Sequence, residues 1–189
     1  MQAQLISFLT SYHPITQSDA QLISLVAEKK NFSKGSTLSE AGKVCRELFF
    51  ICSGILRIFR SNENGNEVTH VFLGENRFCT VLQSFNEKTI SLEAIQACTD
   101  TEVLVVSYSD LHKLYTQIPY LEALIHQIHQ QSLLDKIQLQ NAYRGYDSSE
   151  RYELFLKRQP EIALYVSQSD IASYLGITPQ SLSRIRKNR

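Results

Sequence analysis

Residues 167 to 187 of this chain read Ser167-Gln168-Ser169-Asp170-Ile171-Ala172-Ser173-Tyr174-Leu175-Gly176-Ile177-Thr178-Pro179-Gln180-Ser181-Leu182-Ser183-Arg184-Ile185-Arg186-Lys187. Ser167 with Asp170 three positions later has the capping-box spacing that starts a helix, and Gly176 offers the left-handed position that ends one. Thr178 and Pro179 begin a second helix at once, because threonine accepts the N-cap hydrogen bond and proline fits the first helical position. Two short helices joined by one glycine-centred turn predict a helix-turn-helix, a motif that binds DNA.

The two predicted helices divide into an apolar side and a polar side. The apolar residues that would hold them together are Ile171, Ala172, Leu175, Ile177, Leu182 and Ile185. The residues left outward on the second helix are Gln180, Ser181, Ser183, Arg184 and Lys187, with Arg186 near its end. Arginine pairs with guanine and glutamine with adenine, whereas serine and lysine bind phosphates, so this face suits a recognition helix. The alternative is an ordinary helical hairpin whose polar face is solvated. Any surface helix can carry Arg and Lys, but the order of cap, glycine, cap and proline within so short a span is much rarer.

Length and composition predict a soluble chain with one good core and a small appendage. The chain has 189 residues, of which 43% are hydrophobic, and no hydrophobic run is long enough to span a membrane. Residues 1–9 lack the basic start and apolar core of an export signal. We therefore expect a cytoplasmic protein without membrane partners.

Positive charge is concentrated at the helix-turn-helix end. The net charge of the whole chain is zero, which argues against indiscriminate nucleic-acid binding. Residues 1–148 hold 12 Lys and Arg against 15 Asp and Glu, a balance of −3, whereas residues 149–189 hold 7 against 4, a balance of +3. The basic residues from Gly176 onward are Arg184, Arg186, Lys187 and Arg189. A dimer would carry two such tips, each able to displace counterions from a phosphate backbone.

The cysteines and histidines predict no metal centre. Cys45, Cys52, Cys79 and Cys98 are dispersed and form no C-x-x-C pair, which favours reduced, partly buried thiols. This pattern in a cytoplasmic protein does not indicate zinc or iron–sulfur ligation. His126 and His129 have i, i+3 spacing without an acidic or cysteine third ligand nearby, so we expect histidines of a polar helix face. We expect no cofactor.

Short strand-like runs alternate with turn signals from about Phe32 to Ser107. The expected strands are residues 48–52, 55–60, 67–73, 90–97 and 102–107. Asn64-Gly65 between the second and third runs is typical of a hairpin turn, because both residues tolerate positive φ. We expect an α+β protein whose first part is an antiparallel β-roll of the jelly-roll type.

A long helix is expected from Pro119 to about Ala142, before Gly145. At ~1.5 Å per residue it would be roughly 35 Å long, too long for so small a barrel to cover. Apolar residues recur along it at intervals of three and four: Leu121, Leu124, Ile125, Ile128, Leu134, Ile137 and Leu139. The same helix of a second copy would cover part of this surface, and packing on the chain's own barrel is the alternative.

This order of β-roll, long helix and C-terminal helix-turn-helix resembles the Crp/Fnr family of bacterial transcription regulators. The stretches that carry the resemblance are residues 34–38 with 41–42, 48–54, 63–67, 171–176 and 183–185. The resemblance implies a homodimeric, sequence-specific DNA-binding regulator. It divides the chain into a cyclic-nucleotide-binding-like sensor domain at 1–117, a dimerisation helix at 118–145 and a helix-turn-helix domain at 146–189.

The resemblance also implies where DNA and other partners bind. Gln180 and Arg184 fall at positions that contact base edges in the family, and Pro179 replaces what is often a third contacting side chain. Ser167, Gln168 and Thr178 would lie near phosphates. The expected DNA-contacting residues are Ser167, Gln168, Thr178, Pro179, Gln180, Ser181, Ser183, Arg184, Arg186 and Lys187. The implied partners are a near-palindromic operator in double-stranded DNA, a second copy of the chain and RNA polymerase.

The sensor domain departs from the family's nucleotide-binding pattern. Family members that bind cyclic nucleotides hold the ribose with a glutamate and pair the phosphate with an arginine, but residues 78–82 and 90–92 contain neither group here. A buried phosphate without a cation would cost on the order of several kcal/mol, so we expect no ordinary cyclic AMP binding. The candidate effector pocket is a degenerate one formed by Phe78, Cys79, Thr80, Val81, Leu82, Ser91 and Leu92. Its effector is unknown or absent.

Two other functions compete with this hypothesis. A cupin-like metal enzyme needs clustered histidines and a carboxylate on neighbouring strands, but the strand region offers only His70, so we expect no enzyme. The second alternative is an effector-binding or protein-interaction module with a degenerate helix-turn-helix. This alternative is suggested by the end of the sequence at Arg189, about one turn after the recognition residues, which leaves little to support the second helix of the motif.

Overall fold

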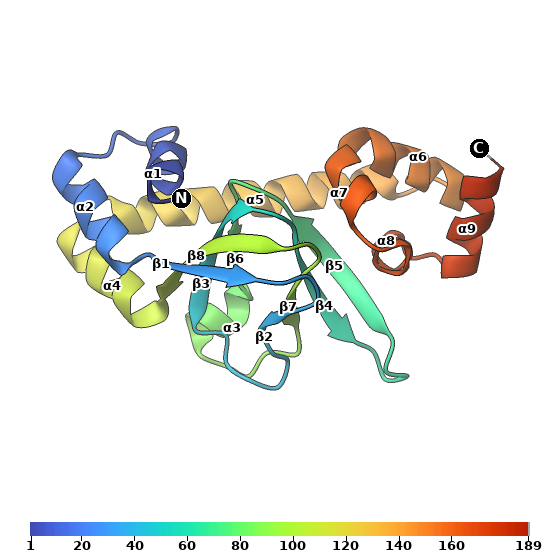
Figure 1. Ribbon diagram of the computed structural model, residues 1–189, viewed down its shortest axis with the longest axis horizontal. Helices are drawn as coiled ribbons and strands as arrows, with labels where there is room; N and C mark the ends of the chain where they lie inside the picture. Colours follow the sequence, from blue (N-terminus) through green and yellow to red (C-terminus); the bar gives the residue numbers. More distant parts are fainter. Residues whose placement is uncertain (189) are drawn as a thin grey trace.

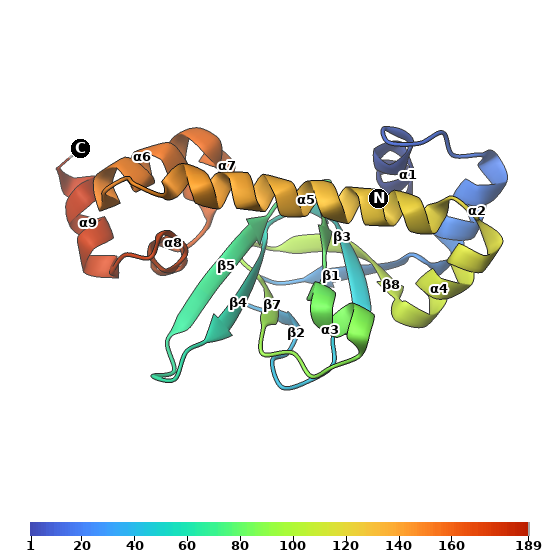
Figure 2. The ribbon, with the colours of Figure 1, turned by 180° about the vertical axis from the view of Figure 1, so that it is seen from behind.

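The computed structural model describes residues 1–188, and Arg189 lies outside the described residues. Its helices are α1 (Gln2–Thr10), α2 (Gln17–Val26), α3 (Leu82–Glu87), α4 (Tyr108–Gln117), α5 (Leu121–Tyr143), α6 (Ser148–Arg158), α7 (Pro160–Tyr165), α8 (Gln168–Leu175) and α9 (Pro179–Lys187). A β-barrel lies along one side of α5 (Figures 1 and 2). Helices α1, α2 and α4 gather at one end of α5, and α6 to α9 form a separate helical group at the other end.

The barrel consists of two four-stranded antiparallel sheets. The first has the order β1 (Glu28–Phe32), β8 (Thr101–Ser107), β3 (Glu47–Ser53) and β6 (Phe78–Cys79). The second has the order β2 (Thr37–Ser39), β7 (Ala94–Ala97), β4 (Leu56–Ser61) and β5 (Glu67–Leu73). Ile51, Ile95 and Val103 are completely buried in the barrel interior. This arrangement confirms the predicted α+β class with an antiparallel β-roll.

The strand expected at residues 90–97 is shorter than predicted. Only Ala94–Ala97 forms β7, and Ile90 makes a single bridge to Val44. Between them the Ser91 hydroxyl accepts the backbone N–H of Glu93 and donates to its carbonyl, at 2.9 and 2.8 Å. This local ring of hydrogen bonds competes with the ladder, as serine side chains do in turns, and keeps residues 91–93 out of the sheet.

The sequence also predicts short helices at 111–115 and 150–157, which form within α4 and α6, whereas α1, α2, α3 and α7 were not anticipated. Of these, α1 and α2 close the end of the barrel core, because Leu5, Leu9 and Ile23 are at most 3% exposed and pack with α4 and α5. Thr16 caps α2 by accepting the N–H of Asp19, a signal that the sequence does contain. Helices α1 and α2 are short, at nine and ten residues, so their apolar spacing covers fewer than three turns.

The long helix α5 changes its environment along its length. It begins at Leu121, two residues later than predicted, since Pro119 lies in the preceding turn. Leu121, Leu124, Ile125 and Ile128 are 2–5% exposed and belong to the chain's own core, as the alternative to a partner helix anticipated. By contrast, Leu133, Leu134 and Ile137 are 52%, 51% and 43% exposed. Only the second half of the helix therefore offers an uncovered apolar surface.

The helical group at the C-terminal end has its own core, and that core continues into the barrel. Phe155, Ala172 and Leu182 are completely buried within it. The barrel residues Ile55 and Phe72 belong to the same cluster. The helix-turn-helix is therefore packed against the outer face of the barrel rather than attached only through α5.

Gly54 is a position where a side chain has no room. Its φ is +91°, and a Cβ atom there would lie 2.5 Å from Thr101 Oγ1 and 2.6 Å from the carbonyl oxygen of Asp100. Gly65 shares the positive φ, +76°, but a Cβ atom would have no neighbour within 4 Å. We expect Gly65→Ala to lower the free energy of unfolding by about 1 kcal/mol and Gly54→Ala by about 1–3 kcal/mol more. Urea denaturation measures both, and equal losses would contradict the packing argument.

Candidate nucleic-acid interface

The helix-turn-helix forms from the local signals that the sequence contains. Ser167 Oγ accepts the N–H of Asp170 at 3.1 Å and begins α8. Gly176, with φ of +67°, ends α8 in the left-handed conformation. Thr178 Oγ1 then accepts the N–H of Ser181 at 3.1 Å, and Pro179 occupies the first turn of α9. These contacts give the two helices and the turn the predicted residue boundaries.

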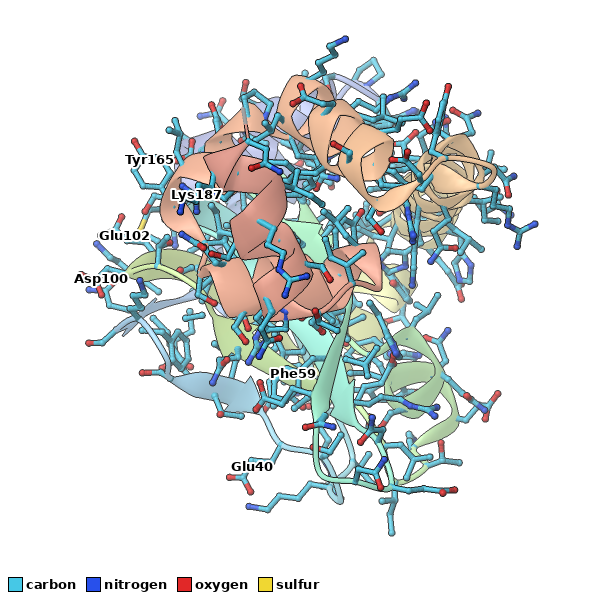
Figure 3. All side chains as sticks on the ribbon, turned by 90° about the vertical axis from the view of Figure 1, so that its right-hand side faces the viewer. Glu40, Phe59, Asp100, Glu102, Tyr165 and Lys187 are labelled. Atoms are coloured by element: carbon cyan, nitrogen blue, oxygen red, sulfur yellow. The ribbon has the colours of Figure 1, made fainter. Side chains whose placement is uncertain are left out.

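One face of α9 is open. Gln180, Ser183, Arg184, Arg186 and Lys187 are exposed, Ser181 is half-buried, and Leu182 is fully buried beneath the helix. The first turn of α9 contains no acid, and its last turn contains Arg184, Arg186 and Lys187. Lys187 lies on the terminal helix at the end of the molecule that faces the viewer in Figure 3. The predicted recognition residues therefore share a solvent-facing, uniformly basic helix.

The remaining predicted DNA contacts lie beside that face. Thr178 and Pro179 are exposed at the start of α9, and Ser167 and Gln168 are exposed at the start of α8. The backbone N–H groups at a helix start can bind phosphates together with such side chains. The structure thus leaves every predicted contact except Ser181 open to solvent.

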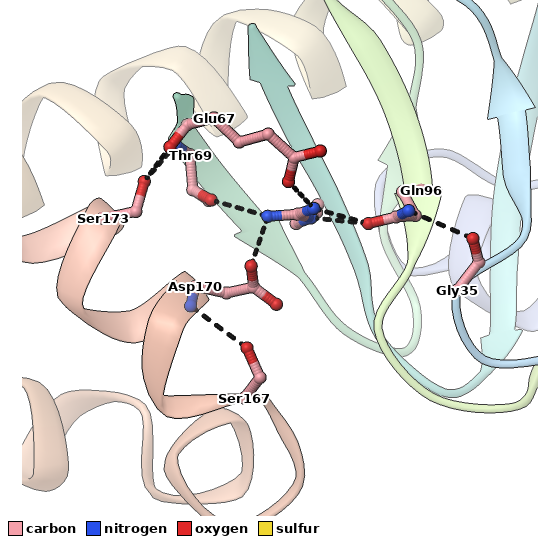
Figure 4. A network of polar contacts seen from close by, with 8 residues as sticks. Gly35, Glu67, Thr69, Gln96, Ser167, Asp170 and Ser173 are labelled. Carbon is pink, nitrogen blue, oxygen red and sulfur yellow. Dashed lines mark hydrogen bonds and ion pairs between the residues drawn. The ribbon is translucent and has the colours of Figure 1, made fainter. Parts of the chain in front are cut away.

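A buried arginine of the barrel holds this motif against the barrel. Arg57 on β4 has a side chain only 5% exposed, and it forms ion pairs with Asp170 of α8 and Glu67 of β5. Its remaining donors reach Gln96 Oε1 at 2.9 and 2.6 Å and Thr69 Oγ1 at 3.4 Å. Figure 4 shows these partners converging from the barrel and from α8. Sequence reasoning missed Arg57, whose partner Asp170 is 113 residues away.

Asp170 consequently does not complete the capping box that its spacing predicted. Ser167 accepts the backbone N–H of Asp170, but the carboxylate of Asp170 is directed to Arg57 instead of returning to the start of α8. A guanidinium with little access to water binds a carboxylate more strongly than an exposed N–H does. The prediction of a cap was correct, and the prediction of a reciprocal box was wrong.

A second contact joins α8 to the open edge of the barrel. Ser173 Oγ accepts the N–H of Thr69 at 2.9 Å and donates to the carbonyl of Glu67 at 2.8 Å. Because β5 is an edge strand of its sheet, this hydroxyl satisfies backbone groups that would otherwise lack a partner. Phe72 and Tyr174 add an aromatic contact, with ring centroids 5.1 Å apart.

The residues predicted for an effector pocket separate in the structure. Phe78, Thr80 and Leu82 line a cavity of about 360 Å³ beside α5. Cys79 and Val81 instead belong to the barrel interior, and burial raises the pKa of the Cys79 thiol far above its usual range. Of the two remaining residues, Ser91 is buried and Leu92 is 75% exposed. Neither of them lines that cavity. The seven residues therefore do not form one site.

The cysteines and histidines show no metal cluster within residues 1–188, where no three His, Cys, Asp or Glu side chains converge. All four cysteines are free and buried. His126 is exposed as predicted, but His129 is not on a polar face, because its Nε2 atom is buried without a hydrogen-bond partner. In the same part of the chain, no helix combines the length and apolar character needed to cross a membrane.

Known proteins resemble this chain both in the barrel and over nearly its full length. Residues 29–117 match the family model of the cyclic nucleotide-binding domain. The fumarate and nitrate reduction regulatory protein of Vibrio cholerae is 25% identical over 178 residues, which cover 87% of this chain and 70% of that protein. The regulatory protein HlyX of Actinobacillus pleuropneumoniae is 22% identical over 191 residues, which cover 95% of this chain and 77% of HlyX.

Solved structures share the whole arrangement. FixK2 from Bradyrhizobium japonicum superposes with a TM-score of 0.73 at 19% identity, covering 86% of this chain and 84% of FixK2. A transcriptional regulator of the Crp/Fnr family from Eubacterium rectale gives a TM-score of 0.75 at 18% identity, covering 96% and 87%. In this chain too, a barrel that matches the cyclic nucleotide-binding domain is joined by one long helix to a helix-turn-helix. Over both parts the chain resembles the transcription regulators of the Crp/Fnr family.

Asp170 is the residue with which to test the attachment of the helix-turn-helix to the barrel. Asp170→Asn leaves Arg57 buried with Glu67 as its one carboxylate, so we expect the free energy of unfolding to fall by about 2 kcal/mol. Glu161→Gln, at an exposed carboxylate of α7, should change it by less than about 0.5 kcal/mol.

Chemical denaturation of both variants gives the comparison. Combining Asp170→Asn with Arg57→Met should cost clearly less than the sum of the two single changes, because the pair acts as one unit. Additive losses, or an Asp170→Asn variant as stable as the parent, would show that the ion pair does not hold the two halves together.

Proposed function

We propose that this protein is a homodimeric, sequence-specific DNA-binding transcription regulator of the Crp/Fnr type. The observation that carries the proposal is the exposed basic face of α9, held on a helix-turn-helix that is packed against the barrel. We divide the chain functionally at residues 1–117, 118–145 and 146–189, for sensing, dimerisation and DNA binding. RNA polymerase is a further expected partner, and the cytoplasm the expected location.

Base reading is assigned to two residues of α9. Gln180 and Arg184 are four positions apart and therefore lie on the same side of the helix, where both are exposed. Their side chains suit bidentate contacts with adenine and guanine in the major groove. Ser183, Arg186 and Lys187 flank them and would bind phosphates, which fixes the orientation of the helix without reading sequence.

Dimerisation is assigned to the uncovered half of α5. Leu133, Leu134 and Ile137 are roughly half exposed, and Ile137 follows the two leucines by four and three residues, so the three side chains form one apolar strip. A second copy packed there would place two α9 helices about a DNA twofold axis, with about 34 Å between successive major grooves. This geometry matches a near-palindromic operator.

Cyclic AMP is not the effector that the residues favour. The resemblance places the ribose-binding glutamate within residues 78–82 and the phosphate-binding arginine within residues 90–92, and neither segment contains such a residue. Neither segment can neutralise a cyclic phosphate, so a buried nucleotide would leave its charge unpaired. The sensor half is therefore assigned a different effector or none.

Arg184→Ala tests base reading. We expect specific affinity for an operator selected from random DNA to fall by at least about tenfold, because one bidentate base contact contributes about 1–3 kcal/mol. Lys113→Ala is the matched control, since Lys113 carries the same single positive charge and its side chain is 72% exposed on α4, far from the helix-turn-helix. Fluorescence anisotropy measures both variants at several salt concentrations.

The same titrations define the contradictory outcome. If Arg184→Ala retains both affinity and sequence preference, α9 does not read bases through Arg184. If even the unmodified protein selects no sequence and shows no salt dependence, the proposed DNA-binding function is wrong.

Ile137→Glu tests the dimer. A carboxylate in the centre of the apolar strip would be buried without a partner, so we expect a dimer of the parent protein to become a monomer at micromolar concentration. Gln138→Glu adds the same charge one position along the helix, at an exposed site, and should remain dimeric. Sedimentation velocity gives the masses, and a dimer that survives Ile137→Glu would place the interface elsewhere.

A further inference from the structure

The cavity beside α5 is lined by three parts of the molecule. Its barrel wall is apolar and contains Ile58, Val71, Leu73, Phe78 and Leu82. Helix α5 forms the opposite wall, and Gln159 and Ile162 close one end from the helix-turn-helix side. A volume of about 360 Å³ is within the usual range for small-molecule sites.

Besides Asp135, three polar residues of α5 line this cavity on one helical face. His129, Ser132 and Lys136 follow one another at intervals of three and four residues. Within residues 1–188, neither the Ser132 hydroxyl nor the Lys136 ammonium has a side-chain partner. His129 Nε2 is buried with no hydrogen-bond partner, and burial lowers the pKa of His129 to about 4, so its ring is neutral near pH 7. Buried polar groups without partners are rare and call for an explanation.

The charges at the cavity leave one cation in excess. Arg77 is paired with Asp135 at 3.3 Å, and Gln131 also donates to Asp135 at 2.9 Å. Lys136 is the remaining charged group of the lining. The site therefore matches one negative charge on a body that is otherwise apolar.

We propose that this cavity binds a small amphipathic monocarboxylate, with its carboxylate at Lys136 and Ser132 and its hydrocarbon body against the barrel wall. Medium-chain fatty acids have this chemistry. The proposal names a ligand for the sensor half, and only its effect on DNA binding rests on the proposed function. The site differs from a cyclic-nucleotide phosphate position, because Ser91 and Leu92 lie outside its lining.

The lining also links the cavity to the DNA-binding part. Gln159 Nε2 donates to the hydroxyl of Tyr174 on α8 at 3.2 Å. Phe72, another lining residue, packs against the same tyrosine. A hydrocarbon chain in the cavity would thus contact two residues that hold α8, and its occupancy would bias the placement of the helix-turn-helix.

Calorimetric titration of the full chain with sodium decanoate at pH 7, below its micelle concentration, tests the site. We expect saturable binding of one decanoate per chain, with decanol and inorganic phosphate each binding at least about tenfold more weakly. Lys136→Gln should weaken decanoate binding by a similar factor. Lys113→Gln, on the exposed side of α4, should leave it unchanged.

Several results would overturn the proposal. The absence of saturable decanoate binding would do so, and so would equal affinity for decanol or a preference for phosphate. Normal decanoate binding by Lys136→Gln would also do so, provided that the far-ultraviolet spectrum and melting temperature of this variant match those of the parent protein. Arg184→Ala separates this proposal from the proposed function, since it should bind decanoate normally. If the unmodified protein binds DNA specifically but does not bind decanoate, the ligand site is rejected. If it binds decanoate but no specific DNA, the DNA-binding role is rejected.

Discussion

The pairing of the Arg57 guanidinium constrains the rest of the structure. A buried arginine keeps its charge, so it needs carboxylates and hydrogen-bond acceptors within reach. The barrel supplies Glu67, Gln96 and Thr69, and the second carboxylate comes from Asp170 of α8. Moving the helix-turn-helix away would leave the cation with fewer partners at an exposed barrel face. The need of one buried strand cation for carboxylate partners therefore selects the position of the helix-turn-helix.

Packing between α8 and α9 extends this constraint to α9. Ser173 holds α8 on β5 and Asp170 holds it on β4. α9 packs on α8 because its Leu182 is fully buried in the cluster that also contains Ala172 and Leu175 of α8. Arg151 Nη1 also donates to the carbonyl of Leu175 at 2.9 Å, which satisfies the end of α8. The barrel and α9 thus form a continuous set of contacts in addition to their covalent link through α5.

The sequence could predict what depends on neighbours along the chain. Ser167, Gly176 and Thr178 act within four residues, so the helix-turn-helix boundaries were readable, and so was the order of elements. The role of Arg57 depends on a partner 113 residues away. One signal was available: residues 55–59 are almost continuously apolar, which is typical of a strand covered on both faces, and an arginine inside such a run needs a buried partner. The identity of that partner is a tertiary property.

Helix α5 shows why regular spacing does not predict the environment. The same apolar pattern runs along the whole helix, but the first half is covered by the barrel and by α1 and α2, whereas the second half extends past this cover. Its exposed strip and its cavity-facing residues share that second half, so a partner chain and a ligand would act on one rigid element. The partner chain or the ligand can shift the equilibrium between docked and undocked helix-turn-helix only as far as it binds one of these two arrangements more tightly than the other. Since the ion pairs of Arg57 stabilise the docked arrangement, an effector that frees α8 must bind the undocked form tightly enough to offset their loss.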